Sequence, residues 1–281
     1  MLQIYTATQL LAPTSRDIYD EVVEVISLSF AKDPGTRWLF QHLTEEQYMT
    51  AVPHYFQFLL QAALQVGAFV VVSREDAPGQ SSTTPTSSNH HSKIQAVAVV
   101  IPPSGNAGMN SSMNALRAGF FGLVWHCGVR MIWTLLTQLL PAMEALEKRL
   151  HPNGAERHHH FTLLALAARP EMQGKGLGKT LLIELQRIVS EAAGKTVFGQ
   201  AAAEVDSGKE RQAAGSSRGP APLYLEASTP SSKRLYERVG FVARDTLVYG
   251  TLDEQAGKDL VIKEDGEVVG GRMFAMFWSP P

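Results

Sequence analysis

The amino-acid sequence predicts an α/β or α+β fold in which helices flank a mixed β-sheet. Short apolar runs typical of strands alternate along the chain with longer stretches whose apolar residues recur at helical spacing. The last two strand-like runs look antiparallel, so the sheet is expected to be mixed. Of the 281 residues, 44% are apolar, which is enough to form a sizeable core.

The first hundred residues are expected to form a strand, two helices and a hairpin. The first helix carries apolar residues at helical spacing behind Ser15, its expected N-cap. Alternating and β-branched runs on either side of a polar stretch predict the hairpin. The expected ranges are 2–8 for the strand, 15–30 and about 45–64 for the helices, and 68–73 with 94–103 for the hairpin.

The rest of the chain is expected to be helical to about residue 149 and then to alternate between strands and helices. A strand is expected to enter a glycine-rich loop, which leads into a helix with one leucine-rich stripe. The expected ranges are 160–168 for this strand, 177–189 for the stripe, 223–228 for a strand, 231–241 for a short helix, and 241–250 with 272–279 for the final antiparallel strands.

We expect one domain over residues 1–281, interrupted by two polar insertions. Residues 74–93 are rich in Ser, Thr and Pro, and residues 199–222 are rich in Gly and small polar residues. Neither stretch can bury enough apolar surface to offset the entropy of ordering it. Both are therefore expected to be long, mobile loops.

Charge, cysteine content and the N-terminus argue against several classes of protein. With 25 basic and 27 acidic residues, the chain lacks the basic excess of a nucleic-acid-coating protein. Cys127 is the single cysteine, which excludes an intrachain disulfide and favours a reducing compartment. The N-terminus lacks the features of a signal peptide, and residues 115–143 are interrupted by Arg and His, so we expect a cytoplasmic protein with no membrane partner.

The stretch from Arg169 to Leu182, RPEMQGKGLGKTLL, contains the motif on which the function depends. Its GKT resembles the end of a P-loop, but the first glycine of that motif would be at Gln173. The dinucleotide fingerprint also fails, since the third glycine would be Lys179 or Leu181. The pattern Gln/Arg-x-x-Gly-x-Gly fits fully, over residues 173–178.

This loop has the chemistry of an anion site. Glycines let the backbone approach a ligand closely, and the first amides of the following helix have no intrahelical partner. These amides carry the positive end of the helix dipole, and Lys175 and Lys179 add charge. The alternative is a glycine-rich turn that only caps a helix.

The order of strand, Gln-x-x-Gly-x-Gly loop, helix, LYLEAS strand and LYERVGF helix over His160 to Phe241 resembles the GNAT superfamily of acyl-coenzyme A-dependent N-acetyltransferases. The spacing looks most like the puromycin N-acetyltransferase-like branch, as does SFAKDPGTRWLF from Ser29 to Phe40. The resemblance implies a central, mostly antiparallel sheet with one parallel strand pair that splays apart at the cofactor slot. The two polar insertions depart from the compact pattern of the family.

The resemblance implies acetyl-coenzyme A as co-substrate. Its pyrophosphate would be held by the loop, and its pantetheine would lie along the preceding strand, whose backbone amide would polarise the thioester carbonyl. The SSKR stretch could contribute Lys233 or Arg234 to the coenzyme A phosphates, and an exposed helix start explains both residues equally well. The implied cofactor-binding residues are Leu166, Ala167, Ala168, Gln173, Gly174, Lys175, Gly176, Leu177, Gly178, Lys179 and Ser232.

Tyr236 matches the general acid of the family, and a phenol of pKa ~10 can protonate a departing thiolate. Alternatively, Tyr236 only packs. The base is left open between His160, Glu226 and bulk water; a polar strand end and a salt bridge are the structural alternatives. No metal site is expected, since neighbouring strand histidines diverge.

The acceptor site is expected to use Asp33, which could attract a cationic amine, and Trp38 and Phe40, which could form an apolar wall. These two aromatic residues could equally belong to the core. The favoured function is acetyl transfer to a primary amine of a small molecule or xenobiotic, by direct attack in a ternary complex. A non-catalytic acyl-coenzyme A sensor, a protein or peptide N-acetyltransferase and, less favoured, a nucleotide-hydrolysing enzyme are the alternatives.

Overall fold

The computed structural model describes residues 1–75, 92–109, 111–152, 154, 158–194, 220–251, 260–262 and 268–280. Most of the two expected insertions, 74–93 and 199–222, lies outside the described residues. Of the described helices, none alone is long and apolar enough to cross a bilayer; Phe120–Cys127 and Val129–Leu150 meet that test only together, with a bend of 115° between them.

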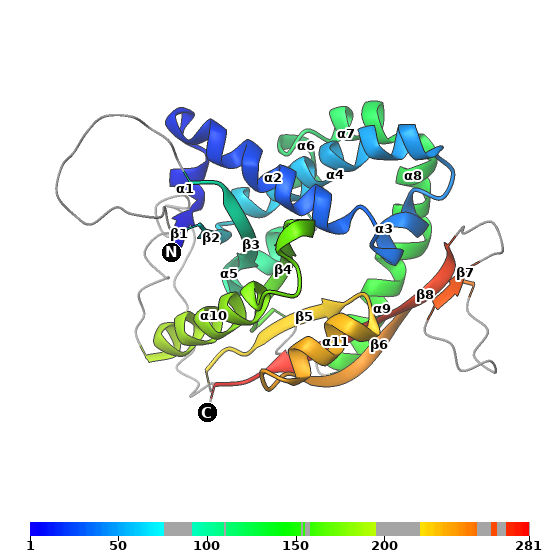
Figure 1. Ribbon diagram of the computed structural model, residues 1–281. Helices are drawn as coiled ribbons and strands as arrows, with labels where there is room; N and C mark the ends of the chain where they lie inside the picture. The colour runs from blue at the N-terminus through cyan, green and yellow to red at the C-terminus, as the bar shows by residue number, and fades with distance from the viewer. Residues whose placement is uncertain are drawn as a thin grey trace.

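The described strands form one eight-stranded sheet in the order β1-β2-β3-β4-β5-β8-β6, with β7 paired to β8 (Figure 1). Every neighbouring pair is antiparallel except β4 and β5, which are parallel. The fold class expected from the sequence is therefore confirmed. The strands are β1 Leu2–Thr6, β2 Phe69–Arg74, β3 Ile94–Ile101, β4 Phe161–Ala168, β5 Leu223–Ala227, β6 Val242–Gly250, β7 Leu260–Ile262 and β8 Val268–Trp278.

Helices cover both faces of this sheet. The α-helices are α1 Ala7–Leu10, α2 Arg16–Phe30, α3 Pro34–Leu39, α4 Glu45–Gln65, α5 Pro103–Met109, α6 Ser112–Arg117, α7 Phe120–Cys127, α8 Val129–Thr134, α9 Leu140–Leu150, α10 Leu177–Gly194 and α11 Pro230–Glu237. Short 3₁₀ turns lie at Pro13–Ser15 and Pro170–Met172, and a π-helical turn lies at Leu135–Leu139.

The buried apolar side chains form two clusters, one on each face of the sheet. The first lies between the sheet and the helices α2, α3, α4 and α7–α9, and we call this side of the sheet the α2 face. The second lies beneath α10 and α11, and we call that side the α10 face. In Figure 1, α10 and α11 lie together at the lower front, whereas α2 and α4 cross the top. The expected leucine-rich stripe of α10 is buried in the second cluster, where each such side chain contributes about 1.5–3 kcal/mol.

Some local expectations were confirmed only in part, and some elements were not expected. Ser15 occupies the N-cap position of α2, but its side chain makes no capping bond because a 3₁₀ turn runs directly into the helix. The first strand ends at Thr6, which forms a capping box with Gln9 and starts α1. Neither α3 nor β7 was expected, and both are short elements with weak periodicity.

Candidate active site

The β4 and β5 strands pair only over a short stretch and then diverge. Their register joins Phe161 to Leu223, Thr162 to Tyr224 and Leu163 to Leu225, and no further pair follows. On the other edge of β4, the register with β3 shifts so that Leu164 is an extra residue between Leu163 and Ala165. Because a bulge bends its strand, β4 turns away from β5 immediately after the last pair.

The bulge also changes which side chains face which core. Phe161 and Leu163, before the bulge, are buried in the cluster of the α10 face. Ala165 and Ala167, after it, are buried in the cluster of the α2 face. We call the unpaired parts of the two strands, 164–168 of β4 and 226–227 of β5, the β4–β5 divergence.

The glycine loop follows β4 and begins the next helix. Gly174 and Gly176 have φ angles of +76° and +84°, which only glycine adopts without strain. A Cβ atom built on either residue would have no atom within 4 Å, so the backbone is open to solvent. No backbone hydrogen bond to another described residue uses the N–H groups of 174–176. Together with the free amides of the first turn of α10, these groups form the geometry of an anion site.

The loop side chains fold back on the protein rather than across these amides. Gln173 donates its Nε2 to the carbonyl oxygen of Ala168 at 3.2 Å. The Nζ of Lys175 lies 3.4 Å from the sulfur of Met172. Lys179 is exposed, whereas Leu177 is half-buried against the α10-face cluster. The charge of both lysines is therefore available to an anion at the loop.

Gly178 connects the loop to the second motif. A Cβ atom at this position would lie 3.5 Å from a methyl group of Leu235 in α11 and 3.7 Å from one of Leu166 in β4. The first turn of α10 thus packs directly between β4 and the residue next to Tyr236. Two stretches some sixty residues apart in the chain meet here.

The start of α11 is held by its own capping box. The Oγ1 of Thr229 accepts from the N–H of Ser232 at 3.0 Å, and the Oγ of Ser232 bonds back to Thr229. The Nζ of Lys233 lies 4.7 Å from the ring centre of Phe274 and 3.7 Å from Glu237. The hydroxyl of Ser232 therefore already has a structural role in the helix cap.

Tyr236 is buried on the α10 face, with 8% of its surface exposed. Its ring centre lies 5.8 Å from that of Phe241, which folds back after Gly240 ends the helix at a φ of +88°. Burial raises the pKa of the Tyr236 phenol well above its ordinary value, and the negative charge of Asp33 adds to the shift. The phenol consequently keeps its proton at neutral pH.

Glu226 lies on the opposite side of the sheet from Tyr236. It is the first β5 residue beyond the last β4 pair, and its Oε1 accepts from the hydroxyl of Tyr224 at 2.7 Å. Burial raises the pKa of the Glu226 carboxyl; the bond from Tyr224 opposes this shift, and the charge of Glu147 adds to it. The carboxyl is thus a stronger base than an exposed glutamate.

His160 immediately precedes β4, at the end of the strand away from the loop. It is buried, and its ring centre lies 5.0 Å from that of Tyr224 and 5.9 Å from that of His151. Its Nδ1 has no hydrogen-bond partner among the described residues. Burial, assisted by the neighbouring histidines, lowers the pKa of His160 to about 3. The imidazole is neutral at pH 7 and weakly basic.

The three residues expected at the acceptor site lie on α3 or at its two ends, with Asp33 as the N-cap, Trp38 within the helix and Phe40 as the C-cap. The Oδ1 of Asp33 accepts from the N–H and the hydroxyl of Thr36, at 3.0 and 3.2 Å, and so caps α3. Trp38 and Phe40 are each 1% exposed and belong to the α2-face core. Trp38 and Phe40 therefore belong to the core, which was the alternative to a place in the wall of the acceptor site. Asp33 is only half-buried, and its charge raises the pKa of Tyr236 and of Tyr249.

Among known proteins, only solved structures of low sequence identity resemble this chain. No family model matches the chain. No curated protein matches it either. A structure of histone acetyltransferase HPA2 and related acetyltransferase from Corynebacterium glutamicum is 17% identical, with 100% of this chain and 97% of that chain covered and a TM-score of 0.44.

Two further solved structures have the same level of similarity. Arylalkylamine N-acetyltransferase 2 from Aedes aegypti is 14% identical over 100% of this chain and 99% of its own, with a TM-score of 0.44. The ribosomal-protein-S18-alanine N-acetyltransferase from Escherichia coli is 14% identical over 100% and 94%, with a TM-score of 0.37. Similarities at this level assign neither an activity nor an acceptor to this chain, so its function is argued from its own site.

Sequence reasoning missed two residues at this site. Tyr224 lies two positions before Glu226 on one strand, so period-two spacing could have placed both on one face. Arg169 is buried with 3% exposure beside the loop, and nothing in the local sequence indicates its partners, which are distant in the chain. The Leu164 bulge likewise has no local sequence marker.

Other candidate sites are weaker. Within the described ranges, no group of three or more His, Cys, Asp or Glu side chains could hold a metal ion. A hollow of about 340 Å³ lies between α2 and α4, and one of about 360 Å³ lies between α4 and α7. Neither hollow is lined by residues of the glycine loop, by Tyr236 or by Glu226.

Proposed function

We propose that the chain is an N-acetyltransferase that moves an acetyl group from acetyl-coenzyme A to a primary amine. The observation that supports this most strongly is the β4–β5 divergence, which begins at the bulge. The open glycine loop lies at the end of β4. Glu226, with its raised pKa, lies on the unpaired part of β5. Tyr236, with its protonated phenol, is buried on the α10 face, next to the Leu235 that packs on the first turn of α10. A gap between two strands is the part of a sheet where groups on both faces can act on one bond.

The residues present fit acetyl-coenzyme A. Open amides at Gly174 and Gly176 suit the pyrophosphate, and Lys175 and Lys179 complement its charge. The β4 edge beyond Leu163 has no strand partner on the β5 side, so its backbone is free to bond an extended amide chain. When bound, acetyl-coenzyme A supplies an electrophilic thioester carbonyl and a thiol leaving group.

The two titratable groups would divide the proton chemistry between them. Glu226 takes the proton of the attacking amine, for which its raised pKa is suited. Tyr236 holds the proton that the leaving thiolate needs. Because the two groups lie on opposite faces, attack and departure occur from opposite sides of the divergence, which fits direct transfer without a covalent enzyme intermediate.

A small, cationic acceptor fits the α2 face best. Asp33 and Glu226 both lie on this side and would attract an ammonium group before it loses its proton. The α3 helix packs on β8 and α9 packs on β6, so the face is covered by helices rather than open to a folded protein. Trp38 and Phe40 then support Asp33 from the core instead of contacting the acceptor.

Binding and turnover test the function separately. Thermal shift should increase with acetyl-coenzyme A and not with ATP, and thiol release should depend on the amine in a panel of small amines and peptides. Binding without release for any amine would instead indicate a sensor. Release with peptides alone would contradict the small-molecule acceptor.

The pH dependence tests the base. Since the pKa of Glu226 is raised and the carboxylate is the active form, kcat/KM should fall as pH drops through a value above that of an ordinary glutamate. Glu226→Gln should lower kcat/KM by roughly 10²–10⁴-fold and remove this acidic limb. If the acidic limb of the kcat/KM profile is unchanged in Glu226→Gln, a group other than Glu226 is responsible for that limb.

His160 should not contribute to that profile. Its pKa of about 3 keeps the ring neutral across the accessible pH range. His160→Gln should therefore leave the midpoint of the acidic limb unchanged, although it disturbs packing against Tyr224. A shift of the limb in this variant, with Glu226 intact, would return His160 to the role of base.

A further inference from the structure

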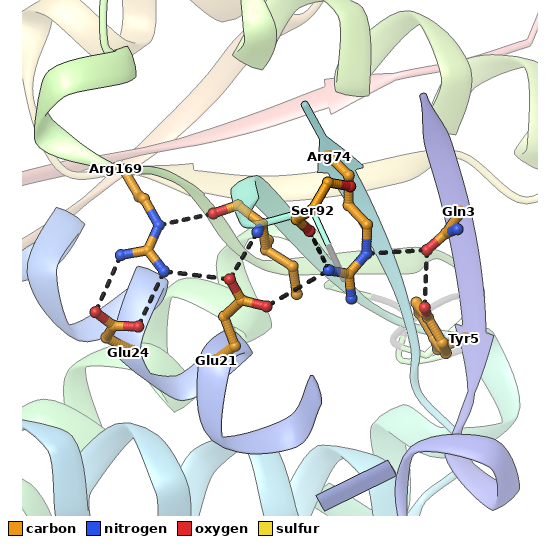
Figure 2. Close-up of polar contacts among 8 residues, drawn as sticks. Gln3, Tyr5, Glu21, Glu24, Arg74, Ser92 and Arg169 are labelled. Atoms are coloured by element: carbon orange, nitrogen blue, oxygen red, sulfur yellow. Dashed lines mark hydrogen bonds and ion pairs between the residues drawn. The ribbon is translucent and has the colours of Figure 1, made fainter. Parts of the chain in front are cut away.

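A buried guanidinium anchors the point where β4 ends and the glycine loop begins. Arg169 follows the last β4 residue, and its side chain turns away from the loop toward α2 (Figure 2). Its Nε donates to the carbonyl oxygen of Ile94 at 2.7 Å. Its two terminal nitrogens donate to the two carboxylate oxygens of Glu24, at 3.0 and 2.9 Å. This bidentate geometry determines both the position and the plane of the guanidinium.

A second carboxylate extends the anchor into the sheet. Glu21, one turn before Glu24 on α2, accepts from Arg169 at 3.4 Å and from the backbone N–H of Ile94 at 2.7 Å. It also lies 3.5 Å from a terminal nitrogen of Arg74 on β2. Figure 2 shows the two arginines on either side of Glu21, with Glu24 beyond Arg169. The network therefore joins α2, β2, β3 and the start of the loop.

The backbone at this point is held as firmly as the side chain. The N–H of Arg169 donates to Gln95 at 2.9 Å, and its carbonyl oxygen accepts from Met172 at 2.8 Å to form the 3₁₀ turn. Gln173 comes directly after this turn and donates its own N–H to the carbonyl oxygen of Pro170 at 3.3 Å, so the open amides begin at Gly174. The orientation of the turn thus sets the direction in which the amides of Gly174 to Gly178 point.

Stability alone is a weak reason for such an anchor. Taking a guanidinium out of water is costly, and an apolar side chain of similar volume often stabilises a buried site equally well. Arg169 has 3% of its surface exposed. The bonds from Arg169 to Glu24 and Ile94 do more than fill space, because they give the backbone a defined geometry where the loop begins.

We propose that Arg169 is a positioning residue for the cofactor phosphates. Held by Glu24 and Glu21, it orients the loop so that its amides converge on the pyrophosphate. The proposal rests on the function proposed above. The same helix, α2, also connects the proposed cofactor site to the proposed acceptor site. It carries Glu21 and Glu24, which hold Arg169, and the carbonyl oxygen of its last residue, Phe30, accepts from the N–H of Asp33 at 2.9 Å.

A cofactor fragment distinguishes positioning from general stability. S-acetyl-pantetheine has the thioester but lacks the pyrophosphate, so the loop cannot hold it. Arg169→Met should lower kcat/KM for acetyl-coenzyme A by roughly 10–100-fold, mainly through KM, because misplacement by about 1 Å has effects of that size. The kcat/KM for S-acetyl-pantetheine should stay within about threefold.

Arg74→Met provides the matched control. Arg74 is also buried, and it bonds to Gln3 and to the backbone of Ser92 as well as approaching Glu21. It is the last residue of β2, however, which is two strands away from β4 in the sheet. Its loss should change both kcat/KM values by the same factor. An equal loss for both acetyl donors in Arg169→Met, or no loss for either, would overturn the positioning role.

The Glu24→Gln variant and the donor preference of the unmodified protein complete the test. If Arg169→Met does not fold, Glu24→Gln removes the charge from a half-exposed partner and should reduce the preference for acetyl-coenzyme A in the same direction. If the unmodified protein shows no preference for acetyl-coenzyme A over S-acetyl-pantetheine, the proposed function fails. If Arg169→Met and Glu24→Gln fold and keep the full preference for acetyl-coenzyme A over S-acetyl-pantetheine, the positioning role of Arg169 is contradicted, while the proposed function is not.

Discussion

Replacing Tyr236 with Phe is expected to lower kcat by roughly 10²–10⁴-fold, the usual contribution of a positioned acid. The substitution removes one oxygen from a side chain buried on the α10 face and leaves its contact with Phe241. The affinity for acetyl-coenzyme A should stay within about twofold, since the loop is untouched. Thiol-release kinetics measure the first quantity, and calorimetric titration with acetyl-coenzyme A measures the second.

Tyr249→Phe is the control for this substitution. Tyr249 is another buried tyrosine whose pKa is raised by burial and by Asp33, and its hydroxyl has no hydrogen-bond partner among the described residues. Its ring packs on Trp38, 5.1 Å between centres, rather than on α11. Turnover should be nearly unchanged. Equal losses in the two variants, or an unchanged chemical step in Tyr236→Phe, would remove the acid role.

Gly176→Asp is expected to weaken acetyl-coenzyme A binding by about 100-fold or more. The φ of +84° at this position costs an ordinary residue roughly 1–2 kcal/mol. The side chain would also project from open backbone, where a phosphate has to approach the loop amides, and its carboxylate would repel that phosphate. Titration with acetyl-coenzyme A at two salt concentrations measures the effect, and higher salt should reduce the repulsive part.

Two controls separate the causes of this loss. Gly176→Asn has nearly the same size as the Asp variant and tolerates positive φ, so the difference between the two variants isolates the charge. Gly178→Ala introduces a methyl group at ordinary contact distances, 3.5 Å from Leu235 and 3.7 Å from Leu166, and should bind almost normally. If the Asp variant binds as tightly as the unmodified protein, the phosphates are held elsewhere.

Much of the fold could be predicted because its patterns are local. The long helix α4 begins and ends within a residue of the expected range, and α10 buries the stripe that its leucines indicated. The hairpin of β2 and β3 follows from two apolar runs of strand length. Where the signal is short or ambiguous, as in α1, α3 and β7, prediction failed because a few residues carry too little periodicity.

The candidate site could be predicted only in part, for the same reason. The glycine loop is a local motif, and the positive φ angles at Gly174 and Gly176 follow from the residue type. The base was left open between His160, Glu226 and bulk water because the sequence does not show which side chain lies beside the separating strands. Burial just before the start of β4 lowers the pKa of His160, whereas Glu226 lies where the paired strands separate.

The sequence by itself determined the segments that have a repeating pattern or a required backbone conformation: the main helices and strands, the loop, and the helix carrying Tyr236. Only the tertiary structure decided which groups meet. The bulge at Leu164 ends the β4–β5 pairing, and Arg169 is held by Glu24, 145 residues earlier in the chain. Such contacts form because packing brings distant segments together, and their strength depends on burial, which no local stretch of sequence specifies.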